Sequence, residues 1–335
     1  MSESMLTIGI PTYNRSAYLR TALASALGQT SSEVKIIVSD NASTDDTEAV
    51  VGELGGRIRY ERAGTNLGPM NNFIRLLELC DTEYFSWLQD DDCLDQRFAE
   101  RALCAFRANP AITIYSAFAL MSEGMESHYK AKVYGPSFPA DFLTGKSVQI
   151  VDGRLVTPFS LFMSVTFPPV AAFRTESLRA VLRSRSGLTD LFAERTWGAH
   201  AAASGLFAVD PFIGAIVRLH PGQSQFSMLH REEKEWLIMA QDLDQLAARW
   251  NIDWLDGFAD ALSKTETVHR QAWLRMSESW PRDLALCRQV AQALKDSLPG
   301  YTRRSERPLK ALLRNLTPPV LWNGLGAATR RLSGR

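Results

Sequence analysis

Hydrophobic runs and stretches with helical spacing alternate over the first 120 residues of the chain. Apolar runs rich in branched and aromatic side chains predict strands at residues 6–10, 35–39, 58–62, 84–88 and 112–120. Positions spaced three or four residues apart predict helices at residues 18–27, 71–79 and 96–108, and Ser43 is expected to cap another helix. Strands that alternate with helices predict βαβ units, a mostly parallel sheet and an α/β fold.

The pattern changes after residue 120. Residues 121–160 have no clear period and are expected to form an irregular insertion. Residues 155–173 carry no charge, but Pro158, Pro168 and Pro169 favour a buried loop and strand over a membrane span. Residues 230–298 have helical spacing, with a core expected to include Trp236, Leu237, Trp254, Phe258 and Trp273.

Polar side chains gather where three predicted strands end. The first strand leads into Thr12, Tyr13, Asn14 and Arg15, the second into Asp40 and Asn41, and the fourth into Asp90, Asp91 and Asp92. Open α/β sheets bind ligands at the carboxyl ends of their strands. The sequence therefore predicts a ligand site at this edge.

Three adjacent carboxylates at Asp90–Asp92 repel one another unless a cation or hydrogen-bond donors neutralise them. Oxygen ligands suit Mg²⁺ or Mn²⁺, and Mg²⁺ is typically held by one or two carboxylates together with substrate phosphates. One interpretation is a metal that holds a diphosphate. The alternative is a solvated acidic turn that caps the helix beginning near Gln96.

Asp40 and the turn at Asn66 also allow two interpretations. The Asp40 carboxylate could accept a hydrogen bond from a nucleobase imide, or it could belong to a helix cap. Asn66-Leu67-Gly68-Pro69 has the composition of a plain turn, and it would face the same crevice.

These segments together resemble glycosyltransferase family 2. The motifs are I-P-T-Y-N-R at residues 10–15, V-S-D-N-A-S-T-D-D-T at 38–47, N-L-G at 66–68 and L-Q-D-D-D at 88–92. They follow the order and spacing of that family, closely over residues 5–120 and more loosely to about residue 225. The resemblance implies the GT-A fold, a Rossmann-like nucleotide-binding sheet with helices on both faces, and transfer of a sugar with inversion.

The resemblance also implies roles for single residues. The nucleotide pocket would be lined by Pro11, Thr12, Tyr13 and Arg15, the base held by Asp40, and the ribose and diphosphate bordered by Asn66. Asp90 would lie near the ribose and the metal, Asp91 would face the donor sugar, and Asp92 would hold Mn²⁺ or Mg²⁺.

The catalytic base is expected on a later helix, because family members place an acid about eleven positions before a glycine that leads into a strand. Counting back eleven residues from Gly205 gives Glu194, and Asp190 is the rival candidate. The family usually has the pair Glu-Asp at this point, whereas this sequence has Ala193-Glu194. A carboxylate there would take the proton of the acceptor hydroxyl.

Arg218 and His220 resemble the family's R-x-H-x-x-x-S segment. His220 could reach the diphosphate or the metal, and Arg218 could offset phosphate charge. The alternative for His220 is a turn residue with a satisfied ring.

The zero net charge conceals an asymmetry. Residues 301–335 carry eight basic side chains and one acid, hence +7, which leaves −7 for residues 1–300. Leucines and Trp322 beside these cations suit an interfacial helix on anionic lipid, or a helix docked on the protein itself. The acidic body argues against a nucleic-acid partner.

The resemblance and the pattern together divide the chain into three parts. Residues 1–225 are the expected GT-A catalytic domain, with a nucleotide-binding half at 5–120 and an acceptor-side half at 121–225. Residues 226–300 are a helical region, and 301–335 are a basic amphipathic tail. The amino-terminal residues lack the features of a signal peptide, and no cysteine pair has C-x-x-C spacing, so a cytoplasmic location is expected. The basic tail would allow a peripheral position at the inner face of the cell membrane.

The sequence thus predicts a metal-dependent inverting glycosyltransferase, of hexosyl or deoxyhexosyl type. It would move a sugar from a nucleotide-sugar donor to a glycan or lipid-linked oligosaccharide in bacterial surface-polysaccharide synthesis. One alternative is a sugar nucleotidyltransferase, although the loop at Pro11–Asn14 lacks the glycines of a phosphate loop. Another is a non-catalytic nucleotide-sugar-binding protein.

Overall fold

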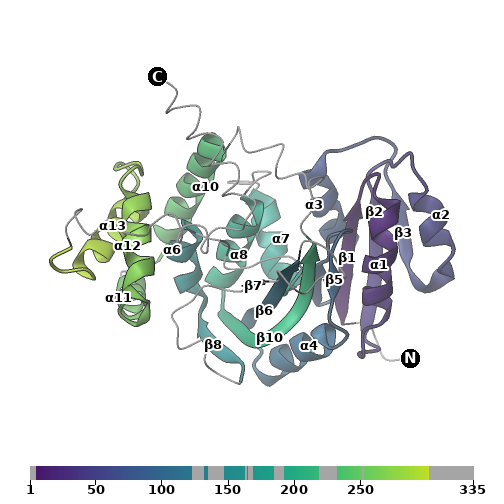
Figure 1. Ribbon diagram of the computed structural model, residues 1–335, viewed down its shortest axis with the longest axis horizontal. Coiled ribbons are helices and arrows are strands. Elements are labelled where there is room, and N and C mark those ends of the chain that lie inside the picture. The colour runs from purple at the N-terminus through teal and green to yellow at the C-terminus, as the bar shows by residue number, and fades with distance from the viewer. Residues whose placement is uncertain are drawn as a thin grey trace.

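A computed structural model describes residues 5–122, 132–134, 147–162, 164, 169–184, 192–218, 232–250 and 253–301. Its centre is a mixed sheet with the strand order β3-β2-β1-β4-β9-β6-β10-β5, to which β7 adds on β6 and β8 adds on β10 (Figure 1). The strands are β1 (Leu6–Thr12), β2 (Val34–Asp40), β3 (Arg59–Arg62), β4 (Tyr84–Trp87), β5 (Cys93–Leu94), β6 (Ile112–Ser122), β7 (Lys132–Tyr134), β8 (Gln149–Asp152), β9 (Ala171–Arg174) and β10 (Leu206–Arg218).

The helices cover this sheet and continue beyond it. They are α1 (Ser16–Leu27), α2 (Thr47–Gly52), α3 (Pro69–Leu79), α4 (Phe98–Ala108), α6 (Val156–Ser160), α7 (Thr175–Ser184), α8 (Ala193–Ala203), α10 (Glu232–Ala247), α11 (Asp253–Lys264), α12 (Thr267–Ser277) and α13 (Ala285–Asp296). Two 3₁₀ turns lie at Gly55–Arg57 and Gly153–Leu155.

The strands β3, β2, β1 and β4 are parallel to one another, as the alternating pattern predicts. β10 is parallel to β6, whereas β9 lies antiparallel between β4 and β6. Every residue of β1 is buried, which is typical of a parallel strand covered on both faces. The expected α/β class is therefore confirmed. The expectation of a mostly parallel sheet is wrong, because β5, β7, β8 and β9 all pair antiparallel with their neighbours.

Alternate residues of β2 enter two different cores. Ile36 and Val38 pack in a cluster with side chains of α1, α2 and α4, whereas Ile37 packs in a second cluster with side chains of α3, α7 and α8. Successive side chains of a strand point to opposite faces, so helices cover both faces of the sheet. This is the layered arrangement expected of the GT-A fold.

The carboxyl-terminal helices α10 to α13 continue the second core beyond the sheet, at the left of Figure 1. Phe159 of α6 contacts Phe258 and Trp273 edge to face, with ring centroids 5.2 and 5.6 Å apart. The expected helical region is confirmed, but Leu237 is 38% exposed on α10 and not part of its core. The helical period alone did not fix which face of α10 is buried.

Two local expectations are wrong. Ser43 does not cap α2, which begins at Thr47; the Asp45 carboxylate accepts the Thr47 N–H instead. The Ser43 hydroxyl accepts the Asn14 N–H, so it joins the loops after β1 and β2. The described parts of residues 121–160 are also more regular than expected, since β7, β8 and α6 lie there, while residues 123–131 and 135–146 lie outside the described residues. Within the described ranges, no helix is long and apolar enough to cross a bilayer.

Candidate active site

The three aspartates form a buried turn between β4 and β5. Asp90, Asp91 and Asp92 are only 5%, 5% and 2% exposed, and the Asp92 N–H donates to the Gln89 carbonyl. β5 follows at once and pairs antiparallel with β10, with Cys93 opposite Ile216. The turn is therefore held from both sides by the sheet, and it is not the solvated helix cap that was the alternative.

Two arginines from neighbouring strand ends contact this turn. The Arg15 guanidinium, just after β1, lies 2.6 Å from an Asp91 oxygen and 3.3 Å from an Asp90 oxygen. The backbone N–H of Arg218, at the end of β10, donates to Asp92 Oδ1 over 3.0 Å. The Arg218 guanidinium itself lies over the Tyr18 ring. The carboxyl ends of β1, β4 and β10 therefore meet at the acidic turn.

The electrostatics of the turn favour an additional cation. Burial raises the pKa of Asp90 to about 7, the Asp91 charge adds to this rise, and Arg15 opposes it. Burial likewise raises the pKa of Asp92 well above its usual range. The Asp91 charge adds to this rise, and the hydrogen bond from the Arg218 N–H opposes it. These carboxylates are short of positive charge at neutral pH, which a divalent metal would supply.

Asp90 and Asp92 have the chemistry to hold Mn²⁺ or Mg²⁺ with substrate phosphate oxygens. Among the described residues, no group of three or more His, Cys, Asp or Glu side chains is arranged to enclose a metal by itself. His220 lies outside the described residues, so its expected contact with the metal stays a prediction.

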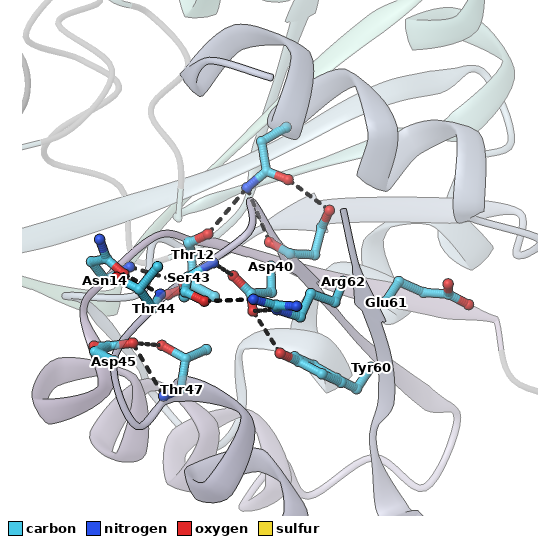
Figure 2. Close-up of polar contacts among 12 residues, drawn as sticks. Thr12, Asn14, Asp40, Ser43, Thr44, Asp45, Thr47, Tyr60, Glu61 and Arg62 are labelled. Atoms are coloured by element: carbon cyan, nitrogen blue, oxygen red, sulfur yellow. Dashed lines mark hydrogen bonds and ion pairs between the residues drawn. The ribbon is translucent and has the colours of Figure 1, made fainter. Parts of the chain in front are cut away.

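Asp40 lies at the end of β2 and is surrounded by donors from its own chain (Figure 2). Its Oδ1 accepts the Ser43 N–H over 2.8 Å, and its Oδ2 accepts the Tyr60 hydroxyl over 2.6 Å. The Arg62 Nε lies 3.5 Å from the same Oδ2, and the Arg62 guanidinium also donates to the Ser43 carbonyl. Both oxygens of the carboxylate expected to hold the base are thus engaged.

The loop after β1 is fastened to the loop after β2. The Asn14 side-chain oxygen accepts the Thr44 N–H over 2.7 Å, in addition to the bond between the Asn14 N–H and Ser43 (Figure 2). Asn14 and Ala42 both have positive φ, at 53° and 64°. Non-glycine residues in this region cost free energy, and such strain is concentrated at functional sites.

Asn41 connects this edge to the Asn66 turn. Its buried amide donates to the Asn66 side chain over 2.9 Å and accepts the Leu67 N–H over 2.7 Å. Asn66 is itself exposed, as is Tyr13 at 42%, whereas Pro11 and Thr12 are buried. The structure therefore brings the expected donor-binding residues to one edge of the sheet, with Tyr13 and Asn66 open to a ligand.

Glu194 lies in the first turn of α8, and its carboxylate accepts the Ser164 hydroxyl over 2.7 Å. Burial raises its pKa above the ordinary glutamate value, while the nearby Arg195 charge and the Ser164 hydrogen bond act to lower it. Such a shift makes a carboxylate a stronger base when it is ionised. The rival Asp190 lies outside the described residues.

The first turn of α8 lies near the same edge as the acidic turn. Trp197, three residues after Glu194, stacks on Trp87, the last residue of β4, with ring centroids 4.5 Å apart. Asp90 follows Trp87 by three residues. The contact between Trp87 and Trp197 therefore connects the strand that leads into the expected metal ligands with the helix that carries the expected base.

Sequence reasoning missed several residues of this site. Tyr60, Arg62 and Trp197 contact expected site residues or the strands that carry them. Asn41 was expected at this edge beside Asp40, but its hydrogen bonds to the Asn66 turn were not. Tyr60 and Arg62 lie on the next strand, and no local pattern indicates that their side chains turn toward Asp40.

Comparison with known proteins concerns the family and the fold of the chain. Residues 7–163 match the model of glycosyl transferase family 2. An uncharacterized glycosyltransferase of Rickettsia typhi is 32% identical over 133 residues, which cover 38% of this chain and 41% of that protein. The abequosyltransferase RfbV of Salmonella typhimurium is 36% identical over 96 residues, covering 27% of this chain and 29% of its own.

A third relative is the GalNAc(5)-diNAcBac-PP-undecaprenol beta-1,3-glucosyltransferase of Campylobacter jejuni, 36% identical over 91 residues, or 26% of this chain and 29% of that one. The chain thus spans well under half the length of these curated relatives. Among solved structures, residues 1–349 of S. aureus TarS in complex with UDP-GlcNAc have a TM-score of 0.50 and 16% identity, covering 87% of this chain and 92% of the other. The similarity to TarS is a similarity of fold.

The sheet, the helices on both of its faces and the acidic turn at its carboxyl edge define a GT-A-like α/β protein. The part of the chain that carries the four motifs, residues 7–163, belongs to glycosyltransferase family 2.

Proposed function

We propose that the protein is a metal-dependent inverting glycosyltransferase that moves a sugar from a nucleotide-sugar donor to a glycan or lipid-linked oligosaccharide. The observation that carries this proposal is the buried turn Asp90–Asp92, which lies beside Arg15 at the carboxyl edge of a family 2 sheet. A buried cluster of three carboxylates beside the Arg15 guanidinium suits a divalent cation and a diphosphate better than a structural role.

Different residues would bind the nucleoside and the metal. Asp40, Tyr13 and the Asn66 turn would hold the nucleoside, and Asp90 and Asp92 would hold Mn²⁺ or Mg²⁺. When bound, the metal would neutralise the diphosphate and so make it a better leaving group. Arg15 keeps Asp91 and Asp90 in place, and Arg218 lies where it could offset remaining phosphate charge.

Glu194 is the proposed general base. Its ionised carboxylate would accept the proton of the acceptor hydroxyl as that oxygen attacks the anomeric carbon, while the nucleoside diphosphate leaves from the opposite face. Attack opposite the leaving group inverts the anomeric configuration. The raised pKa of Glu194 suits proton transfer from a hydroxyl, and Asp190 remains the alternative base.

The acceptor class rests on the relatives and on charge. An abequosyltransferase and an undecaprenol-linked glucosyltransferase are among the curated relatives, which favours assembly of a bacterial surface polysaccharide. The +7 charge of residues 301–335 suits contact with anionic lipid at the inner membrane face. Loss of salt-sensitive liposome binding on deletion of this tail would support that contact, and unchanged binding would contradict it.

A panel of nucleotide sugars tested for thermal stabilisation, with and without Mn²⁺, tests the donor site. A shift of the melting temperature with one donor, dependent on Mn²⁺, would support the proposal. Stabilisation by no nucleotide sugar, or equal stabilisation without metal, would contradict it. Release of pyrophosphate from a nucleoside triphosphate and a sugar phosphate would favour a nucleotidyltransferase instead.

A further inference from the structure

The hydrogen bond between Tyr60 and Asp40 lies where the proposed donor site would read the base. Tyr60 is on β3, and its hydroxyl donates to Asp40 Oδ2 over 2.6 Å (Figure 2). The other oxygen, Oδ1, is bound to the Ser43 N–H within the chain's own loop. Oδ2 is therefore the oxygen that faces a neighbouring strand rather than its own backbone.

Arg62 leaves little additional access to this carboxylate. Its Nε lies 3.5 Å from Oδ2, and it donates to the Ser43 carbonyl over 2.8 Å. The Asp40 side chain is 1% exposed, whereas that of Arg62 is 46% exposed. A base that donates a hydrogen bond to Asp40 must therefore compete with groups already in place.

We propose that Tyr60 is a specificity-determining residue of the donor site, because its hydroxyl is an internal competitor for the Asp40 oxygen that would accept a hydrogen bond from the base. This inference rests on the proposed function and on the base-holding role of Asp40. The competitor weakens binding of bases whose ring carries an imide N–H, since that N–H must displace the hydroxyl. Bases that lack this proton do not meet the same competition.

The chemistry of the bases makes the inference testable. A carboxylate is an acceptor only. Uracil presents a ring N–H to it, whereas the equivalent ring nitrogen of cytosine has no hydrogen and is itself an acceptor. UDP and CDP are alike in ribose and diphosphate and differ at this ring nitrogen and at the neighbouring exocyclic group, so the change in the ratio of their dissociation constants when the Tyr60 hydroxyl is removed reports on the contact with Asp40.

Isothermal titration of UDP and CDP, each with Mn²⁺, to the wild type and to Tyr60→Phe tests the inference. Phenylalanine keeps the ring but removes the donor, so UDP should bind about tenfold more tightly relative to CDP, as expected for one hydrogen bond to a charged group. Tyr60→Leu also lacks the hydroxyl and should change the ratio in the same direction if the phenylalanine variant folds poorly.

Tyr115→Phe is a matched control. The Tyr115 hydroxyl donates to buried Asp210 over 2.7 Å, and Asp210 also has an arginine partner, Arg101, so the same kind of contact is removed elsewhere. Its UDP-to-CDP ratio should equal that of the wild type. An unchanged ratio in both Tyr60 variants, or weaker UDP binding relative to CDP, overturns the inference. Failure of the wild type to bind either UDP or CDP also overturns the inference, whereas failure to bind any nucleoside diphosphate, purine nucleotides included, contradicts the proposed function itself.

Discussion

The indole of Trp87 stacks on the indole of Trp197, with ring centroids 4.5 Å apart and planes inclined by 16°. Trp87 ends β4 just before the acidic turn, and Trp197 lies one helical turn after Glu194. Both rings are nearly inaccessible to solvent. Their contact therefore sets the separation between the proposed metal ligands and the proposed base.

Trp197→Leu should lower kcat by about tenfold and leave the donor KM nearly unchanged, because small displacements of a catalytic group reduce rate more than binding. Steady-state kinetics would show this split. Trp273→Leu removes an equally buried indole from the carboxyl-terminal helices and should reduce stability without changing kcat. Equal losses of kcat in both variants would mean that the effect is one of stability alone.

The acidic turn should make stability depend on pH. The pKa of Asp90 is raised from 3.8 to about 7 on folding, so the folded state holds more protons than the unfolded state between about pH 4 and 7. Stability should therefore fall as pH rises through this range. Mn²⁺ competes with the protons, so its stabilising effect should be larger at pH 7.5 than at pH 5.5.

Melting temperatures measured across this range, with and without Mn²⁺, check the prediction. Asp90→Asn removes one of the two carboxylates with a raised pKa, and it should reduce both the pH dependence and the metal effect. A wild-type protein that gains as much stability from Mn²⁺ at pH 5.5 as at pH 7.5 would argue against metal binding by these carboxylates.

Glu194→Gln should reduce kcat by about 10² to 10⁴, the usual contribution of a general base, with little change in donor affinity. In the wild type, the rate should fall on acidification at a pH above the ordinary glutamate pKa, because burial raises the pKa of Glu194. Glutamine cannot titrate, so this limb of the pH–rate profile should disappear. Persistence of the same limb in Glu194→Gln would assign the base to another acid, with Asp190 the first to examine.

Asn41→Ala should destabilise the protein by about 1 kcal/mol, because it removes the buried amide that bonds both the Asn66 side chain and the Leu67 N–H. It should also weaken donor binding, since the Asn66 turn loses its connection to β2. Chemical unfolding and nucleotide titration measure the two effects. Asn71→Ala removes an exposed contact to the Leu67 carbonyl of the same turn and should change both quantities less.

The sheet could be predicted from the sequence because its strands and helices follow one another with clear periods. β1, β2 and β4 lie within one or two residues of the predicted bounds, and the polar residues that follow them do meet at one edge. Parallel strands have their carboxyl ends on one side, so the position of Asp40 relative to Asp90 follows from topology alone.

The contacts that complete the site could not be predicted in the same way. The hydroxyl of Tyr60 and the indole of Trp197 reach their partners across the sheet or between layers, over sequence separations of 20 and 110 residues. Ser43 was misjudged for the same reason: its hydroxyl contacts the Asn14 loop, which is distant in sequence, rather than its own helix.

In the proposed function, sugar transfer depends on Asp92 together with a divalent cation. Release of nucleoside diphosphate from the stabilising nucleotide sugar, with and without Mn²⁺, in the wild type and in Asp92→Ala tests this dependence most directly. The wild type should release nucleoside diphosphate only with metal, and Asp92→Ala should lose both release and metal-dependent donor binding. Full activity of Asp92→Ala, or equal release by the wild type without a divalent cation, would contradict it.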